Sequence, residues 1–406
     1  MHYLSDVLSN NLRIIHLPTC SEVAYCGFAI HAGTRDEQSK EFGLAHFVEH
    51  MLFKGTNKRK SWHILNRMEH VGGELNAYTS KEDTFVYSIF MAEDYERAVE
   101  LMTDLIIHSQ FPANEIEKER DVILDEIQSY EDTPSELIFD EFENLLFNGH
   151  PLGHHILGTK RSLRSFDRKA GRTFMEHHYI ADNMVFFSMG PIDFKPIFRL
   201  AEKYLTAIPS KTHISIREKP LPIQSHQVHK KKSTHQSHVI IGTQAYHMHD
   251  KKRIPLYLLN NILGGTGMNS RLNIALREKH GLVYNVESNI TSYTDTGLWS
   301  IYFGTDPKNR QKAVGLIDKE LSLLRNKKLS DLQLSAAKKQ AIGQMVVSSE
   351  NKEGLFLGMG KSFLHYNKYD SLTETFKKIE GITAQQIQDT ANEIFAPEQL
   401  FSLIYE

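Results

Sequence analysis

The spacing of apolar and polar residues along the first half of the chain predicts alternating strands and amphipathic helices. Period-two alternation predicts strands at residues 12–17, 23–31, 74–80, 84–91 and 184–189. Helical spacing predicts helices at residues 61–70, 95–108, 113–130 and 135–147. Such a mixture is typical of an α+β fold, in which helices pack on one face of an antiparallel-rich β-sheet.

The second half of the chain repeats this order. Its pattern predicts strands at 238–246, 283–290 and 297–303 and helices at 255–263, 270–279 and 308–324. Between the halves, residues 209–233 are polar, contain prolines and carry the run Lys230-Lys231-Lys232, which favours a linker. We therefore predict an N-terminal domain at 1–208, a linker at 209–233 and a homologous C-terminal domain at 234–406.

Length and charge agree with two domains and exclude some classes of partner. The chain has 406 residues, and a domain typically takes about 100 to 200. Its 47 basic and 50 acidic residues nearly cancel, so no general attraction to nucleic acid or to an anionic membrane is expected. The two cysteines, Cys20 and Cys26, are too few for a disulfide framework and favour a reducing compartment.

The N-terminal residues lack the basic and apolar segments of a signal peptide and the arginine-rich pattern of a transit peptide. No apolar run of about 18 residues occurs that could span a bilayer. We expect a cytoplasmic protein.

Candidate chemistry is concentrated between Phe42 and Thr56. Apolar residues occupy most sides of this predicted helix, which indicates that it is buried. His46 and His50 lie one turn apart on one face, so both imidazoles can reach one metal ion, and Glu49 lies beside them. The pattern His-x-x-Glu-His is also the inverted form of the zinc-peptidase helix signature.

A hydrogen-bonded polar network is the alternative interpretation of these three side chains. Burying them without partners would cost on the order of several kcal/mol, and a bound cation removes most of that cost. A metal centre is therefore the better interpretation.

A zinc site needs a third protein ligand, and the helix predicted at 113–130 offers one. Its apolar stripe runs through Ile116, Ile123 and Ile127. Glu119 and Glu126 fall on the same stripe, two turns apart, so both carboxylates point inward. Periodicity alone leaves open which of the two binds the metal.

These motifs resemble the pitrilysin-type (inverzincin) zinc metallopeptidases, which include the two-domain bacterial members, insulin-degrading enzyme and the beta subunit of mitochondrial processing peptidase. In that family His-x-x-Glu-His is followed about 75 residues later by a ligand glutamate, as Glu126 follows His50 here. The resemblance implies one zinc ion per chain, bound by His46, His50 and Glu126. It implies that Glu49 is the general base and that Glu119 supports the site from outside the ligand set.

The resemblance extends to residues 72–80 and 277–284 and so covers most of the chain. It implies that Asn76 and Ala77 lie on an edge strand that holds the substrate, although an ordinary internal strand is equally compatible with the sequence. It also implies that Arg277 and Tyr284 face the zinc site of a partner subunit and contact the substrate carbonyl. At the position equivalent to the metal helix, residues 258–265 contain no His or Glu, so we expect one metal centre.

Together these features predict a zinc metalloendopeptidase that cleaves unfolded or short peptides and forms a homodimer with shared active sites. The alternative is a non-catalytic or heteromeric subunit of a peptidase complex. Non-catalytic relatives typically lose the His-x-x-Glu-His residues or carry a long glycine-rich loop, whereas this chain keeps the residues and its Gly264–Gly267 loop is short. Heteromeric partners divide the two motifs between chains, whereas this chain carries both.

Overall fold

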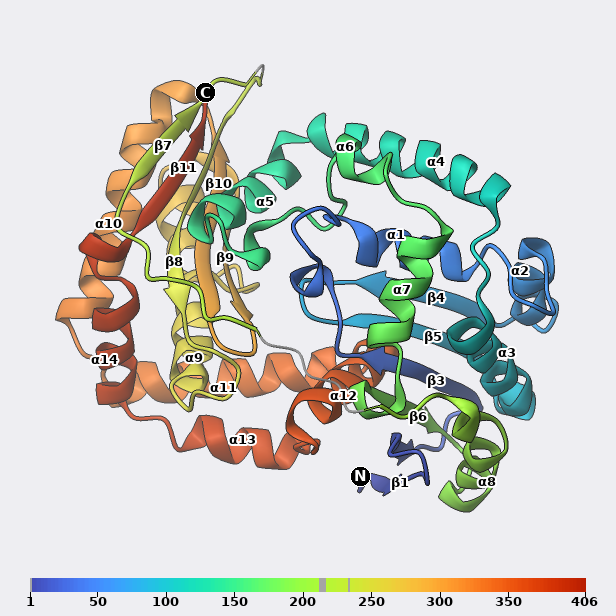
Figure 1. Ribbon diagram of the computed structural model, residues 1–406. Helices are drawn as coiled ribbons and strands as arrows, with labels where there is room; N and C mark the ends of the chain where they lie inside the picture. The colour runs from blue at the N-terminus through green and yellow to red at the C-terminus, as the bar shows by residue number, and fades with distance from the viewer. Residues whose placement is uncertain (1, 212–216, 233) are drawn as a thin grey trace. The chain divides into compact units, whose positions relative to one another are not determined.

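The computed structural model describes residues 2–211, 217–232 and 234–406. The chain forms two compact units, each assembled from three segments (Figure 1). The first unit contains Met1–Gln128, His154–Arg217 and Ser349–Ser371, and the second contains Ser129–Gly153, Glu218–Ser348 and Leu372–Glu406. No helix among the described residues is both long and apolar enough to cross a bilayer.

The first unit is built on a six-stranded sheet. Across the sheet its strands follow the order β1 (Leu4–Val7), β2 (Arg13–Pro18), β6 (Met184–Gly190), β3 (Val23–Ile30), β5 (Thr84–Met91) and β4 (Glu74–Thr79). Only the β2–β6 pair is parallel among these neighbours. The strand β4 therefore forms one edge of the sheet.

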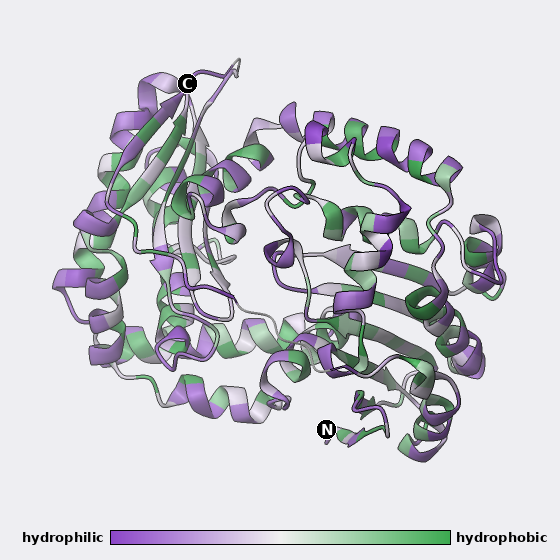
Figure 2. Ribbon diagram, in the orientation of Figure 1, coloured by the Kyte–Doolittle hydropathy of each residue, from purple (hydrophilic) through white to green (hydrophobic). Residues whose placement is uncertain are grey.

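Both faces of this sheet are covered by helices. One face packs mainly against α1 (Leu44–Leu52), α2 (Ser61–Glu69), α3 (Tyr95–His108), α4 (Ala113–Glu131), α6 (Lys160–Leu163), α7 (Arg168–His178) and α8 (Phe194–Tyr204). The other face packs against α12 (Lys352–Tyr366), where Phe356 stacks on Phe187 with ring centroids 4.3 Å apart. Figure 2 shows green apolar residues along the central strands, whereas α4 is striped purple and green.

The second unit repeats this plan with a five-stranded sheet. Its strands follow the order β7 (Gln227–Lys230), β11 (Phe401–Tyr405), β8 (Ser237–Ala245), β10 (Gly297–Thr305) and β9 (Val283–Ser292), and only β7 and β11 are parallel among the described neighbours. The remaining helices are α9 (Arg253–Gly264), a π-helix at Asn273–Glu278, α10 (Arg310–Asn326), α11 (Asp331–Ser348), α13 (Leu372–Glu380) and α14 (Ala384–Ile394). Helix α5 (Pro134–Leu146) packs on the opposite sheet face, where Phe142 meets Phe401.

The predicted α+β fold with two similar domains is confirmed. The prediction placed helices on one face of each sheet, whereas in the structure one helix also covers the other face. Helix α5 lies in the first half of the sequence but belongs to the second unit, and helix α12 lies in the second half but belongs to the first unit. The change between units at Arg217 lies inside the predicted linker at 209–233, but that segment also contains strand β7, and residues 212–216 and 233 lie outside the described residues. Amphipathic periodicity shows that a helix has an apolar face, but not which sheet that face covers.

Candidate metal centre

Helix α1 begins in a tightly built corner of the first unit. Gly43 precedes it with φ 91°, a left-handed conformation that favours glycine, and a Cβ there would lie 2.6 Å from the Leu157 carbonyl oxygen. The Glu37 carboxylate accepts hydrogen bonds from the backbone N–H groups of Gly43 and Ala45, both at 2.8 Å. Burial raises the pKa of Glu37, and these two amides oppose that rise. The Glu37 side chain therefore satisfies two backbone N–H groups at the buried start of the helix.

His46 and His50 of α1 and Glu126 of α4 meet at one point in the first unit. Each of the three side chains offers a ligand atom, and all of these atoms lie within 4.8 Å of one another. Glu126 Oε2 is 3.8 Å from His46 Nε2 and 3.7 Å from His50 Nε2, and the two imidazole centroids are 4.6 Å apart. The helix α1 thus supplies two nitrogens from one face, and α4 supplies an oxygen opposite them.

These separations fit a tetrahedral zinc ion better than a polar network. Both Nε2–Oε2 distances, 3.7 and 3.8 Å, are too long for hydrogen bonds. Ligand bonds of about 2.0 to 2.2 Å give a tetrahedral edge of about 3.3 to 3.6 Å, close to the observed spacing. Burial, followed by the neighbouring His50, lowers the pKa of His46 to about 3, so its imidazole is neutral, as a metal ligand must be.

The two glutamates that the sequence places on one stripe of α4 take different positions. Glu126 has a side chain 41% exposed and faces both imidazoles. The side chain of Glu119 is only 7% exposed, and its Oε2 lies 3.0 Å from His50 Nδ1, the nitrogen turned away from Glu126. Its other oxygen, Oε1, lies 2.6 Å from Lys54 Nζ. Glu126 is therefore placed to bind a metal, and Glu119 to orient a ligand.

Glu49 lies on α1 between the two histidines in sequence but is not part of the three-residue group. Its Oε2 is buried and has no hydrogen-bond partner among the described residues. Burial raises the pKa of Glu49, and nearby Glu126 raises it further, whereas hydrogen bonding to Thr79 and the proximity of His50 lower it. A carboxylate whose pKa is raised in this way holds a proton more readily than an exposed glutamate, which suits proton transfer beside the three-residue group.

The other predicted site residues are divided between the two units. Asn76 and Ala77 lie on β4, so the predicted edge strand is observed. Arg277, in the π-helix, and Tyr284, on β9, belong to the second unit, where the Arg277 Cζ lies 5.9 Å from the Tyr284 ring centroid. Tyr284 is 86% exposed. Their roles toward substrate stay predictions.

The structure brings together a second group of potential metal ligands, which the sequence analysis did not identify. His31, Asp83 and His365 come together in the first unit, with His365 Nε2 2.8 Å from Asp83 Oδ1. Arg217 Nη1 lies 2.7 Å from His31 Nε2, and Lys361 Nζ lies 3.3 Å from Asp83 Oδ2. Since arginine only donates, it uses the His31 lone pair, and two protein cations already balance this group. We interpret it as a buried ionic network, which no local sequence spacing could reveal.

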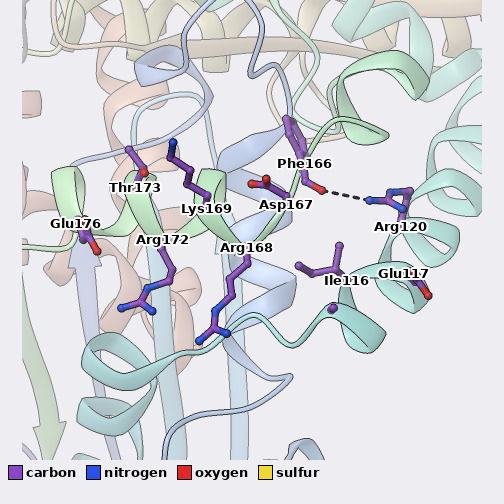
Figure 3. A pocket seen from close by; sticks show the side chains of 11 residues that line it. Ile116, Glu117, Arg120, Phe166, Asp167, Arg168, Lys169, Arg172, Thr173 and Glu176 are labelled. Atoms are coloured by element: carbon purple, nitrogen blue, oxygen red, sulfur yellow. Dashed lines mark hydrogen bonds between the residues drawn. The ribbon is translucent and has the colours of Figure 1, made fainter.

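A cavity of about 760 Å³ lies in the first unit between α4 and α7. Figure 3 shows Arg168 and Arg172 projecting side by side, while Arg120 donates to the Phe166 carbonyl oxygen at 3.2 Å. Its charged lining residues are Arg120, Arg168, Lys169, Arg172, Glu117, Asp167 and Glu176. Because the four cations and three carboxylates nearly cancel, the lining does not select a ligand by charge.

Comparison with known proteins gives a consistent result over most of the chain. The model of the insulinase family (peptidase family M16) matches residues 15–160, and that of the peptidase M16 inactive domain matches residues 165–341. A Bacillus subtilis protein named as an uncharacterized zinc protease is 32% identical over 397 residues, covering 97% of this chain and 96% of that protein. The Saccharomyces cerevisiae protein named mitochondrial-processing peptidase subunit beta is 30% identical, covering 95% of this chain and 87% of that protein.

The fold comparison agrees. The crystal structure of a peptidase M16 inactive domain from Pseudomonas fluorescens has a TM-score of 0.93 at 18% identity and covers 100% of this chain and 98% of that one. At this identity the likeness shows the fold alone.

We expect Glu126→Gln to lose bound zinc, because it replaces the anionic oxygen that faces both imidazoles with a neutral amide. Metal content of the purified protein, measured by mass spectrometry, checks this. The exposed neighbour Asp125 gives a matched control, and Asp125→Asn should keep the wild-type zinc content. Equal zinc in both variants would remove Glu126 from the ligand set.

Proposed function

Because the chain belongs to the insulinase (M16) family of peptidases, we propose that it is a zinc-dependent endopeptidase that hydrolyses unfolded or short peptides. One observation carries the proposal. Three ligand atoms, from His46, His50 and Glu126, surround a common point. Glu49, which has a buried carboxylate oxygen, lies on helix α1 with the two histidines.

In this proposal His46, His50 and Glu126 hold one zinc ion per chain. Two imidazoles and one carboxylate are a donor set that favours zinc and leaves the fourth position of a tetrahedron open. When bound there, the ion supplies Lewis acidity that polarises a peptide carbonyl and makes water more acidic. The relatives named as zinc proteases support this choice of metal.

Glu49 then moves the proton. Its carboxylate takes a proton from the attacking water and passes it to the nitrogen of the leaving amine, so that no covalent bond to the chain forms. Burial raises the pKa of Glu49, which suits a group that must hold this proton between the two steps. General base catalysis of this kind contributes about 10²- to 10⁴-fold to the rate.

Glu49→Gln should reduce turnover of a quenched unstructured peptide by at least about 100-fold, because the amide cannot accept the proton. Zinc content should stay at the wild-type value, since Glu49 lies outside the three-residue ligand group. Glu69→Gln, an exposed change on the neighbouring helix α2, is the matched control. A metal-free Glu49→Gln protein would instead make Glu49 a ligand, and zinc-loaded but inactive wild-type protein would favour the non-catalytic subunit.

The strand β4 offers the substrate a place to pair. The Ser80 N–H donates to the Asp83 carbonyl at 2.8 Å, and β4 pairs in register with β5, so hydrogen-bonded positions alternate along the strand. By this alternation the main-chain groups of Leu75, Ala77 and Thr79 point away from β5. An extended peptide can add there as a further strand. Such pairing reads backbone more than side chains, which supports unfolded or short substrates.

Ala77→Pro should lower kcat/KM about 10-fold, because proline removes one outward N–H group and a typical hydrogen bond is worth about 1 kcal/mol. Ala77→Ser keeps the N–H group and should behave like the wild type. Steady-state hydrolysis of the same peptide by both variants, with unfolding temperatures measured alongside, tests this. Equal kcat/KM values for the two would argue against strand addition at β4.

We further infer a homodimer in which Arg277 and Tyr284 of one chain serve the metal centre of the other. Exposure of Tyr284, at 86%, supports a residue available for such a contact. The name of the yeast relative describes one subunit of an enzyme, which supports assembly in general. Because this chain carries both the His-x-x-Glu-His residues and the Arg-Tyr pair, two identical chains are sufficient.

Mixing inactive Glu49→Gln protein with inactive Arg277→Ala protein should restore part of the activity after subunit exchange. One of the mixed sites then combines a wild-type metal centre with a wild-type Arg277. The control is each variant exchanged with itself under the same conditions. Lack of recovery in a mixed dimer verified by differential tagging would exclude sharing between subunits.

A further inference from the structure

Lys54 follows helix α1 and lies four residues after His50. Its backbone N–H donates to the Met51 carbonyl at 3.1 Å, which continues the turn of the helix. Its ammonium nitrogen lies 2.6 Å from Glu119 Oε1, and Glu119 Oε2 lies 3.0 Å from His50 Nδ1. One buried carboxylate thus joins the side chain of Lys54 to the ring of His50.

We propose that Lys54 is a positioning residue that acts through Glu119 to fix the orientation and tautomer of the His50 imidazole, and so strengthens metal binding at the centre. The inference rests on the proposed function, because it takes His50 to be a metal ligand. Lys54 itself touches neither the other ligands nor, in this proposal, the substrate.

The direction of each hydrogen bond follows from Lys54, at one end of this chain of contacts. An ammonium group only donates, so Glu119 Oε1 accepts from Lys54. The ionised carboxylate only accepts, so His50 Nδ1 carries the proton that it donates to Glu119 Oε2. The lone pair of His50 is then on Nε2, the atom that lies 3.7 Å from Glu126 Oε2. A partner on the far nitrogen is the usual means of orienting a metal-bound histidine.

Glu119 needs Lys54 for this role. Its side chain is 7% exposed, and His50 satisfies only one of its two oxygens. Among the described residues, Lys54 is the one lysine or arginine within 4.0 Å of Glu119. Without the ammonium, a buried carboxylate oxygen would lose its partner, and the hold on His50 would weaken with it.

His46 differs from His50 because it lacks a contact like the one with Glu119. His46 Nδ1 is buried and has no hydrogen-bond partner among the described residues. The protein therefore holds one imidazole of the pair through a charged partner and the other through packing alone. Lys54 also places a positive charge beside a region that contains the carboxylates of Glu49, Glu119 and Glu126.

Zinc affinity tests the inference without use of activity. The full-length chain is loaded with zinc and titrated against a fluorescent zinc chelator as wild type, Lys54→Met, Glu119→Gln and the double variant. Each single change should weaken zinc binding about 10- to 100-fold. Because both act through one chain of contacts, the double variant should be no weaker than the weaker single variant. A separate, structural role would give losses that multiply.

Two further variants separate charge from bulk. Lys54→Arg keeps a cationic donor and should stay within a few-fold of the wild-type zinc affinity. Lys58→Met removes an exposed lysine of the following loop and should change nothing. Imidazole ¹⁵N resonances of the metal-free protein should show the Nδ1–H tautomer of His50 in the wild type and a mixture in Lys54→Met. If Lys54→Met does not fold, Lys54→Gln takes its place in the cycle.

The outcomes distinguish this inference from the proposed function. If wild-type protein binds no zinc, the metallopeptidase proposal fails. If wild-type protein binds zinc and Lys54→Met binds it equally well, or the two losses multiply, only the role of Lys54 is overturned.

Discussion

The first unit depends on compensating the polar side chains that helix α1 carries into an apolar core. His46 is 8% exposed, and Phe47, Val48 and Met51 around it are almost completely buried. Burying polar or charged groups without partners is costly, so each group needs a hydrogen-bond or charged partner from elsewhere in the fold. The Glu37 carboxylate accepts hydrogen bonds at the N-terminus of α1, and Glu119 of α4 lies 3.0 Å from His50 Nδ1. The position of α4 beside α1 is thus set by chemistry as well as by packing.

The same compensation holds the hairpin between β4 and β5. Arg35 Nη1 lies 2.6 Å from Glu82 Oε1, and Arg217 Nη2 lies 2.7 Å from Asp36 Oδ2, with all four side chains nearly buried. Buried pairs persist only where the geometry is good and the remaining hydrogen bonds are made. The Arg35–Glu82 pair ties the hairpin to the segment that leads into α1, and Arg217 reinforces it because its Nη1 also lies 3.3 Å from Glu82 Oε1. Buried ion pairs thereby hold the end of the hairpin that contains the edge strand β4.

The second unit has the same layered plan, and its described residues contain no group of three potential metal ligands. Helix α9 takes the position of α1, and its Asn260 Oδ1 accepts from Trp299 Nε1 at 3.1 Å and from the hydroxyl of Ser288. Neutral amide, indole and hydroxyl groups satisfy one another here within the protein. The two sheets also each receive one helix, α12 or α5, from the opposite half of the sequence. The repeated plan therefore persists although the chemistry and the connections differ.

The sequence by itself determined the features that depend on local spacing. Helical periodicity places His46 and His50 on one face and Glu119 with Glu126 on one stripe, and alternation predicts the α+β layers. Only the tertiary structure decided which of the two glutamates faces both imidazoles, that β4 is an edge strand, and that Lys54 reaches Glu119. It also decided which sheet α5 and α12 cover. These are contacts between segments far apart in the chain, and periodicity, which describes one element at a time, carries no information about them.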